Sequence, residues 1–280
     1  MNKFVYLWFA VKTVFCSCQP DARVNHFKKV RSNYKISKIG KLSSEVNESS
    51  GLAKGNHANS FWTQNDSGGK AELYEIDSRG KLLSTKKIDG AVNKDWEDLA
   101  SDNQGTIYVG DFGNNANTRR SLEIYKVSLL EEKTEKITFN YARQVKFPPE
   151  PENLNYDCEA FFYHQEHLYL FSKNRSKTNH EVMIYQLPSI PGNYALQPQD
   201  SISIETQVTS ADISPDGKTF ALLTYGKILL FEVVDGQINF KKPKGCFRFV
   251  KKQSEALIFI NNSDMLVTNE QGDMFRITRR

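Results

Sequence analysis

The feature that most constrains this chain is a short pattern that recurs five times. In each copy, polar residues lead directly into an apolar run, and the centres of the copies lie 44 to 62 residues apart. A unit of that length accommodates four short β-strands, which is the size of one propeller blade. The five centres are Ser50, Glu97, Glu159, Ala211 and Glu255. The repeat predicts an all-β, five-bladed propeller, with a six-bladed ring hidden in the stretch 186–208 as the alternative.

The order of segments within each copy supports this prediction. A turn rich in Gly, Asn, Asp or Pro follows the first apolar run, and Pro215-Asp216-Gly217 is the clearest of these turns. A second run is rich in β-branched and aromatic residues, and a third alternates polar and apolar residues. The fifth unit reaches Arg280 directly after its third strand. We therefore expect an N-terminal strand over 34–39 to complete the last blade and remove an open edge.

The N-terminus predicts an export signal. Lys3 precedes an apolar run over 4–11 that is too short to remain in a bilayer as a span. Ser17 stands directly before Cys18, which resembles the lipobox of bacterial lipoproteins, and this resemblance implies a lipid on Cys18 and an anchor in the bacterial envelope, at the outer membrane or in the periplasm. Export without a lipid and a cytosolic protein with a misassigned start are the alternatives. The expected division is 1–17 signal peptide, 18–32 linker and 33–280 propeller domain.

Charge and cysteine content narrow the partners. The formal charge is +4, and removal of Lys3 and Lys12 with the signal leaves about +2, which gives no general attraction to nucleic acid or membranes. We expect a monomer that binds no nucleic acid and meets a membrane only through a lipid anchor. Cys158 and Cys246 have no cysteine near them in sequence, which predicts small buried apolar side chains.

Acidic and hydroxyl residues recur where the innermost strands begin. The glutamates at three of the centres would crowd around a narrow axis, where like charges either take up protons or share a cation. Oxygen ligands from carboxylates and a hydroxyl suit Ca²⁺, which accepts six to eight of them in flexible geometry. We therefore predict Ca²⁺ in the central channel. The predicted metal ligands are Ser50, Glu97, Glu159, Asp212 and Glu255.

A second set of polar residues follows the second strands. The first two strands of a blade are antiparallel, so the start of one lies beside the end of the other at the same face of the disc. The two sets together predict a polar mouth that binds a ligand or partner. Its predicted residues are Asp66, Asp98, Asp111, Asp157, Lys173, Arg175, Tyr225 and Glu270.

Two family resemblances follow from these runs. The segments 95–100 and 108–115, with Asn65–Gly69 before them and Asp212–Gly217 after them, are similar to an uncharacterised family of bacterial secreted propeller proteins over most of residues 45–280. That family implies no settled activity.

The channel residues also resemble those of calcium-activated nucleotidases of the apyrase type. These are five-bladed and hold one Ca²⁺ through Ser and Glu residues, one per blade. The matching positions are Ser50, Glu97, Glu159 and Glu255, whereas Ala211 stands where that family has Ser. The resemblance implies the metal. The substrate-binding residues of the nucleotidases have no match here, so their activity is not implied.

Three functions remain open. The favoured one is an exported propeller that holds Ca²⁺ and binds a ligand or partner at its acidic mouth. The second is a metal-dependent hydrolase of phosphate esters or anhydrides, in which Lys173 and Arg175 receive the phosphate and the carboxylates of the mouth hold the metal or position water. The third is an interaction scaffold without metal. The fold alone does not choose among them.

Overall fold

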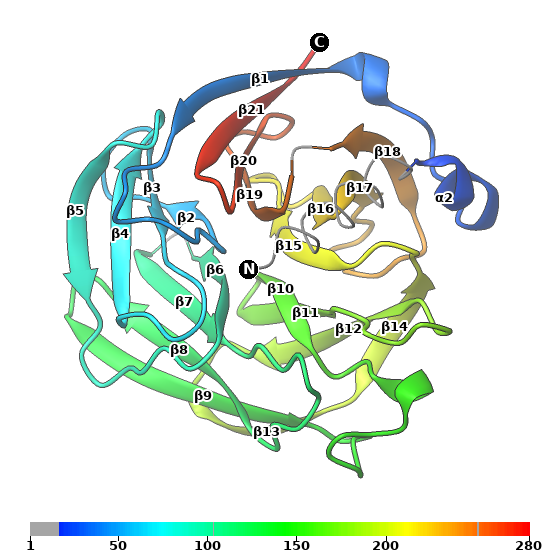
Figure 1. Cartoon of the computed structure of the whole chain (residues 1–280), viewed down its shortest axis with the longest axis horizontal. Coiled ribbons are helices and arrows are strands. Elements are labelled where there is room, and N and C mark those ends of the chain that lie inside the picture. Colours follow the sequence, from blue (N-terminus) through cyan, green and yellow to red (C-terminus); the bar gives the residue numbers. More distant parts are fainter. Residues whose placement is uncertain (1–16, 103, 251) are drawn as a thin grey trace.

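Five antiparallel sheets surround one axis, and each has the four strands expected of a blade (Figure 1). The computed structural model describes residues 17–102, 104–250 and 252–280. The innermost strands are β2 (Ala53–Lys54), β6 (Trp96–Ser101), β10 (Cys158–His164), β15 (Val208–Ile213) and β19 (Ser254–Phe259). The second strands are β3 (Ser60–Thr63), β7 (Thr106–Asp111), β11 (His167–Ser172), β16 (Thr219–Thr224) and β20 (Met265–Asn269). The prediction of a five-bladed all-β propeller is confirmed.

The outer half of each blade is built the same way. The third strands are β4 (Glu72–Asp77), β8 (Leu122–Ser128), β12 (Glu181–Pro188), β17 (Gly226–Glu232) and β21 (Asp273–Arg279). The outermost strands are β5 (Leu82–Lys87), β9 (Lys133–Tyr141), β14 (Pro198–Ser203), β18 (Pro243–Phe249) and β1 (Tyr34–Lys41). The second strands β7 and β16 are buried along their whole length, whereas the outermost strand β5 is largely exposed. The polar composition of the outer strands therefore matches their position at the rim.

The hydrophobic core lies between neighbouring blades. Both faces of an inner strand pack against another sheet, so these strands are apolar on both sides rather than alternating. Aromatic rings make many of the contacts: Phe220 stacks on Phe231 at 4.6 Å within one blade and meets Phe162 of the preceding blade at 5.8 Å. Each blade is thus held by the sheets on either side of it.

The ring closes through the N-terminal strand, as expected. β1 pairs antiparallel with β21, from Tyr34 opposite Arg279 to Lys41 opposite Asp273 (Figure 1). The stretch proposed for a sixth blade has another role. β13 (Gly192–Leu196) adds to the outer edge of the second blade, parallel to β9, before the chain returns to β14 of the third blade.

Residues 18–32, expected to be a linker, pack against the fourth blade. They include the short helix α2 (Gln19–Val24) and are followed by the 3₁₀ turn η1 (Arg31–Asn33). Lys227 Nζ lies 2.5 Å from Asp21 Oδ2, and both side chains are buried. The backbone of Cys246 donates to Lys28 O at 2.8 Å and accepts from Val30 N at 3.0 Å. This N-terminal strap therefore extends the outer edge of β18.

A disulfide joins Cys18 to Cys246, across 228 residues of sequence. The expectation that Cys246 is unpaired is wrong, because the strap brings Cys18 to it. A thioether to lipid would use the same sulfur of Cys18, so a lipid and this disulfide exclude one another at that residue, and the lipid anchor stays a prediction. Cys158 is free and buried, as expected. The rest of the predicted signal peptide, residues 1–16, lies outside the described residues.

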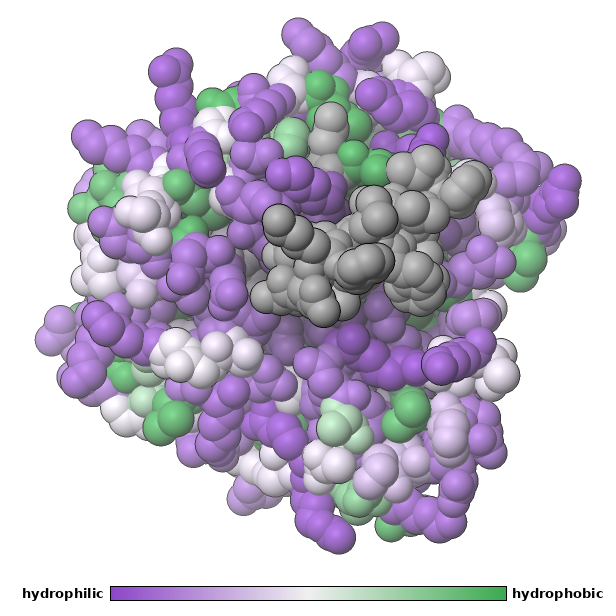
Figure 2. Space-filling view, in the orientation of Figure 1, coloured by the Kyte–Doolittle hydropathy of each residue, from purple (hydrophilic) through white to green (hydrophobic). Residues whose placement is uncertain are grey.

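The surface viewed in Figure 2 is mostly hydrophilic, with hydrophobic residues scattered among the polar ones. No helix of the described chain is both long enough and apolar enough to cross a membrane. The second and third blades are joined by a long connection that contains η2 (Pro151–Asn153).

Candidate metal site at the channel mouth

The starts of the inner strands and the ends of the second strands meet at one face of the ring. Trp96 at the start of β6 pairs with Asp111 at the end of β7, and the other blades repeat this register. In blades two to five the register slips just after the start of the inner strand, which leaves one extra residue there. Such a β-bulge re-aims a side chain. The residues at or beside these bulges are Glu97, Glu159, Thr209 and Glu255, with Ser50 following the Ser49–Asn65 bridge in the first blade.

In the fourth blade, the structure shifts the predicted alignment of the repeats by two positions. Its equivalent residue is Thr209 rather than Ala211, and the Thr209 hydroxyl donates to Ser254 O at 2.8 Å. Asp212 lies near the other end of β15, where its Oδ2 accepts from Phe259 N at 2.7 Å and ties the fourth blade to the fifth. The structure therefore separates Asp212 from the other predicted metal ligands.

Three carboxylates converge at the mouth between the first two blades. One ligand oxygen from each of Asp66, Asp95 and Glu97 lies within 4.8 Å of the others. Glu97 is 7% exposed, and the two aspartates are half-buried. None of the three forms an ion pair with a lysine or arginine among the described residues. This acidic cluster, Asp66–Asp95–Glu97, can hold a metal ion.

Burial and mutual repulsion make the acidic cluster costly to ionise. Burial, together with repulsion from neighbouring carboxylates, raises the pKa of both Asp66 and Asp95 to about 6. Burial also raises the pKa of Glu97 well above its usual range, and the charges of Glu159 and Asp66 add to the effect. A bound cation would reverse these shifts, because it favours the charged form of each group.

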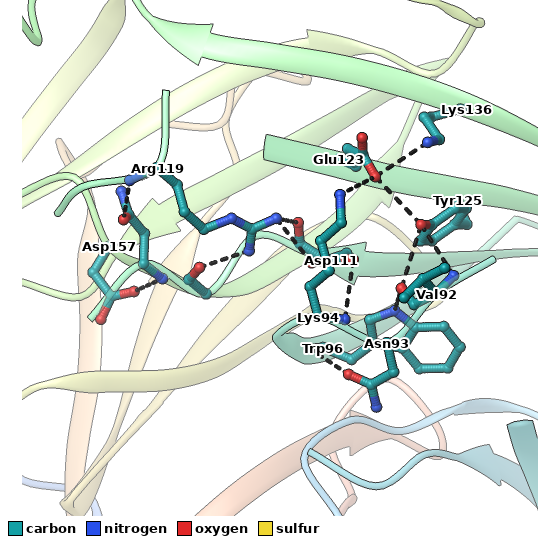
Figure 3. A network of polar contacts seen from close by, with 12 residues as sticks. Val92, Asn93, Lys94, Trp96, Asp111, Arg119, Glu123, Tyr125, Lys136 and Asp157 are labelled. Carbon is teal, nitrogen blue, oxygen red and sulfur yellow. Dashed lines mark hydrogen bonds and ion pairs between the residues drawn. The ribbon is translucent and has the colours of Figure 1, made fainter. Parts of the chain in front are cut away.

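The loop after β7 closes over the acidic cluster. A Cβ on Gly113 would lie 2.1 Å from Glu97 Oε1 and 2.4 Å from Asp95 Oδ2, so any larger residue there would displace these carboxylates or the loop. Gly113 N donates to Asp95 O at 3.1 Å. Arg119 fixes this loop from behind: its guanidinium donates to Gly113 O at 2.7 Å and to Asp111 Oδ1 at 2.9 Å (Figure 3).

Asn93 ties the two blades that supply the acidic cluster. Its Nδ2 donates to Asp66 O at 2.8 Å, and its Oδ1 accepts from Trp96 N at 3.2 Å (Figure 3). Asp95 was not predicted as a site residue. The signal was present, because Asp95 and Glu97 are two positions apart and such residues share one side of an extended strand.

An ammonium group of the chain itself lies among the glutamates for which Ca²⁺ was predicted. Lys173, only 3% exposed, forms an ion pair with Glu159, and its Nζ lies 3.2 Å from the Tyr225 hydroxyl. That hydroxyl donates to Glu255 Oε1 at 2.9 Å. Arg175 donates to Glu159 Oε1 at 2.7 Å. Glu159 and Glu255 therefore have protein partners in the place where a shared metal ion was expected.

Other predicted site residues hold the structure together. Ser50 Oγ accepts from Gln64 Nε2 at 2.9 Å and donates to Trp96 O at 3.4 Å. Asp111 is buried and pairs with Arg119 (Figure 3). Asp157 accepts from Arg175 Nε at 2.6 Å. These contacts place Ser50, Asp111 and Asp157 in packing rather than at an open surface.

Asp98 closes the channel below the mouth. Its Oδ2 accepts from Phe161 N at 3.3 Å and from Ser210 Oγ at 3.1 Å. Ser210 Oγ in turn accepts from Leu257 N at 3.1 Å. This Asp98–Ser210 plug links blades two to five by hydrogen bonds, and both side chains have no exposed surface. Asp98, predicted to bind a ligand, is therefore inaccessible.

Four predicted mouth residues stay partly exposed: Asp66, Arg175, Tyr225 and Glu270. Glu270 is bonded by the Gln253 amide, and burial raises its pKa to about 7. Arg175 keeps a quarter of its side-chain surface exposed. Together with Asp66 they form the accessible rim beside the acidic cluster.

Comparison with known proteins gives a likeness of fold without a family. No protein-family description and no curated protein sequence matches the chain. A solved gluconolactonase from Xanthomonas campestris, described as important in glucose secondary metabolic pathways, resembles the structure with a TM-score of 0.49 and 10% sequence identity. The match covers 88% of this chain and 90% of that one.

Proposed function

We propose that this protein is an exported propeller that binds Ca²⁺ at Asp66, Asp95 and Glu97 and uses the ion to hold a ligand or partner at the channel mouth. The observation that carries the proposal is the convergence of three carboxylates within 4.8 Å, with no basic partner among the described residues. Fully ionised carboxylates at that separation repel strongly unless a cation joins them.

The chemistry of the donors favours a hard divalent cation. The acidic cluster offers oxygen alone, without the histidine or cysteine that softer transition metals prefer. Ca²⁺ takes six to eight oxygens in flexible geometry, whereas Mg²⁺ requires a near-ideal octahedron. Three protein carboxylates leave coordination positions for water or for the oxygen of a ligand. A binding role follows from those open positions.

The contacts at the mouth favour binding over hydrolysis of phosphates. In the hydrolase alternative, Lys173 and Arg175 receive the phosphate. Both are engaged in ion pairs, Lys173 with Glu159 and Arg175 with Glu159 and Asp157. A phosphate would have to displace these carboxylates.

Export is supported by the disulfide, because disulfides persist in oxidising compartments.

The test is thermal unfolding with Ca²⁺ and with chelator, on wild type and two variants. Ligands that bind only the folded state stabilise it, by about 2.7 kcal/mol at a hundred times Kd. We expect Ca²⁺ to raise the Tm of wild type and to leave Glu97→Gln unmoved. Without Ca²⁺ the variant should melt above wild type, because it has lost one repelling charge. Glu270→Gln, which removes a carboxylate outside the acidic cluster, should respond to Ca²⁺ as wild type does.

Three outcomes would contradict the proposal. A wild-type Tm that ignores Ca²⁺ would support the metal-free scaffold. An equal Ca²⁺ response in wild type and Glu97→Gln would place the ion elsewhere. An equal response to Mg²⁺ at the same concentration would remove the argument for Ca²⁺.

A further inference from the structure

The face of the ring opposite the acidic cluster carries a cavity of about 390 Å³. That volume falls within the range of about 300–1,000 Å³ typical of small-molecule sites. Residues at the far ends of the inner strands line it, and all five blades contribute. The lining residues used below are Lys54, Asp102, Tyr163, Asp212, Asp216 and Phe259.

The Asp98–Ser210 plug separates this cavity from the acidic cluster. Glu97 stands second in β6, whereas the cavity lies at the other end of that strand, at its last residue Ser101 and at Asp102. Buried hydrogen bonds of the plug lie between them. The two ends of the channel are therefore independent sites.

Two carboxylates in the cavity are fixed in place with one oxygen left over. Asp102 Oδ1 accepts from Gln104 N at 2.8 Å and from Thr106 N at 3.0 Å. Asp216 Oδ1 accepts from Ser214 Oγ at 2.7 Å and from Lys218 N at 3.1 Å. The hydrogen bonds described for both groups thus fall on Oδ1. Oδ2 of each is an oriented acceptor with lone pairs to spare.

A donor and an aromatic ring complete the lining. Lys54 is exposed, and its ammonium forms no ion pair within the described residues. Tyr163 is held rigid by stacking on Tyr108, with centroids 5.5 Å apart and planes at 10°. Phe259 adds a second apolar side chain. Such a mixture of apolar rings and a few placed polar groups is typical of small-molecule pockets.

We propose that this cavity binds a neutral, polyhydroxylated small molecule of the sugar type. Hydroxyl groups donate to the free oxygens of Asp102 and Asp216 and accept from Lys54, whereas the ring of Tyr163 packs against C–H groups. An anionic ligand would meet three carboxylates, those of Asp102, Asp212 and Asp216, for one ammonium, and an organic cation would meet the ammonium of Lys54. Asp212 Oδ2 already accepts from Phe259 N at 2.7 Å. A neutral ligand whose hydroxyl groups both donate and accept can bond to the carboxylates and to the Lys54 ammonium.

The test is isothermal titration of the full chain with a panel of neutral monosaccharides and disaccharides, in the presence of a chelator. We expect at least one sugar to bind. Asp216→Asn keeps the turn acceptor Oδ1 and replaces the free oxygen, and Lys54→Met removes the donor but keeps the apolar stem. Each should weaken binding about tenfold, equivalent to about 1.4 kcal/mol. Circular dichroism and Tm would verify that both variants fold.

Glu97→Gln separates this inference from the proposed function, because it should bind the sugar as wild type does. Sugar binding that requires Ca²⁺ and is lost in Glu97→Gln would move the ligand to the acidic cluster and overturn the inference. So would the absence of binding by every sugar in the panel, or binding that ignores both Asp216→Asn and Lys54→Met. Binding of small organic acids in place of sugars would refute the neutral ligand.

Discussion

Gly113 lies so close to Glu97 that a Cβ on the glycine would stand 2.1 Å from Glu97 Oε1. The close approach is built from both sides. Arg119 holds Gly113 O from one side, and Gly113 N donates to Asp95 O on the other. The loop therefore presses backbone, rather than a side chain, against two carboxylates of the acidic cluster. A metal ion there would be enclosed on that side by the glycine.

Gly113→Ala should destabilise the protein and abolish its response to Ca²⁺. The added methyl must displace either Glu97 or the loop, and such overpacking costs about 1–3 kcal/mol. The measurement is the Tm with and without Ca²⁺. Gly69→Ala is the matched control, because its Cβ would find no atom closer than 3.7 Å. A Ca²⁺ response in Gly113→Ala as large as that of wild type would contradict the enclosure of the ion.

Lys173→Met should be strongly destabilising. Breaking a buried ion pair costs about 3–5 kcal/mol where the remaining charge is left uncompensated. Arg175 keeps its bond to Glu159 Oε1 at 2.7 Å, so we expect a loss at the lower end of that range. Lys173 and Glu159 are both almost fully buried. The double variant Lys173→Met, Glu159→Gln should recover much of the loss. Urea unfolding of the four proteins in a double-mutant cycle measures this coupling, and additive effects would contradict it.

The fold could be predicted because it depends on local patterns. Each blade repeats the same order of apolar runs and turns, so the five units and the closing strand over 34–39 follow from composition and spacing. The register was harder. Near the start of β15 the bulge makes Thr209 equivalent to Glu97, and an insertion of one residue in a strand leaves no mark in its hydrophobic pattern.

The contacts of the site could be predicted only in part. Acidic residues were expected at the channel mouth, and Glu97 and Asp66 do converge there. The sequence does not show which cation meets which carboxylate. Lys173 reaches Glu159 from the segment after β11, and Cys18 reaches Cys246 from the other end of the chain. Both pairings depend on where the closed ring places distant segments.

Reduction of the disulfide should lower the stability of the protein. A cross-link over a loop of this length restricts the unfolded chain by about 5.5 kcal/mol in the entropic estimate. Cys18→Ser should therefore lower the Tm, and a reductant should lower the Tm of wild type but not that of the variant. Among the described cysteines, Cys18, Cys158 and Cys246, mass spectrometry after alkylation should find only Cys158 unpaired. That thiol should react only on unfolding, because it is buried. An alkylated Cys246 in the oxidised protein would contradict the disulfide.

The stability of the Ca²⁺-free protein should fall as the pH rises from about 4 to about 6. Asp66 and Asp95 have a pKa of about 6 in the folded chain, against about 3.9 for an unperturbed aspartate. Between those values the folded state holds more protons than the unfolded state. The stability that protonation gives is fully present below about pH 4 and is lost as the pH passes about 6.

Ca²⁺ should oppose this loss, because it binds the deprotonated carboxylates and releases protons as it does so. The measurement is the Tm across this pH range, with chelator and with Ca²⁺, on wild type and Asp95→Asn. The variant should show a shallower decline with chelator, since it has one titrating group fewer in the acidic cluster. If the Tm of the wild-type protein in chelator rises with pH, Asp66 and Asp95 ionise without a cost to the folded state. The repulsion that gives the acidic cluster its demand for a cation would then be absent.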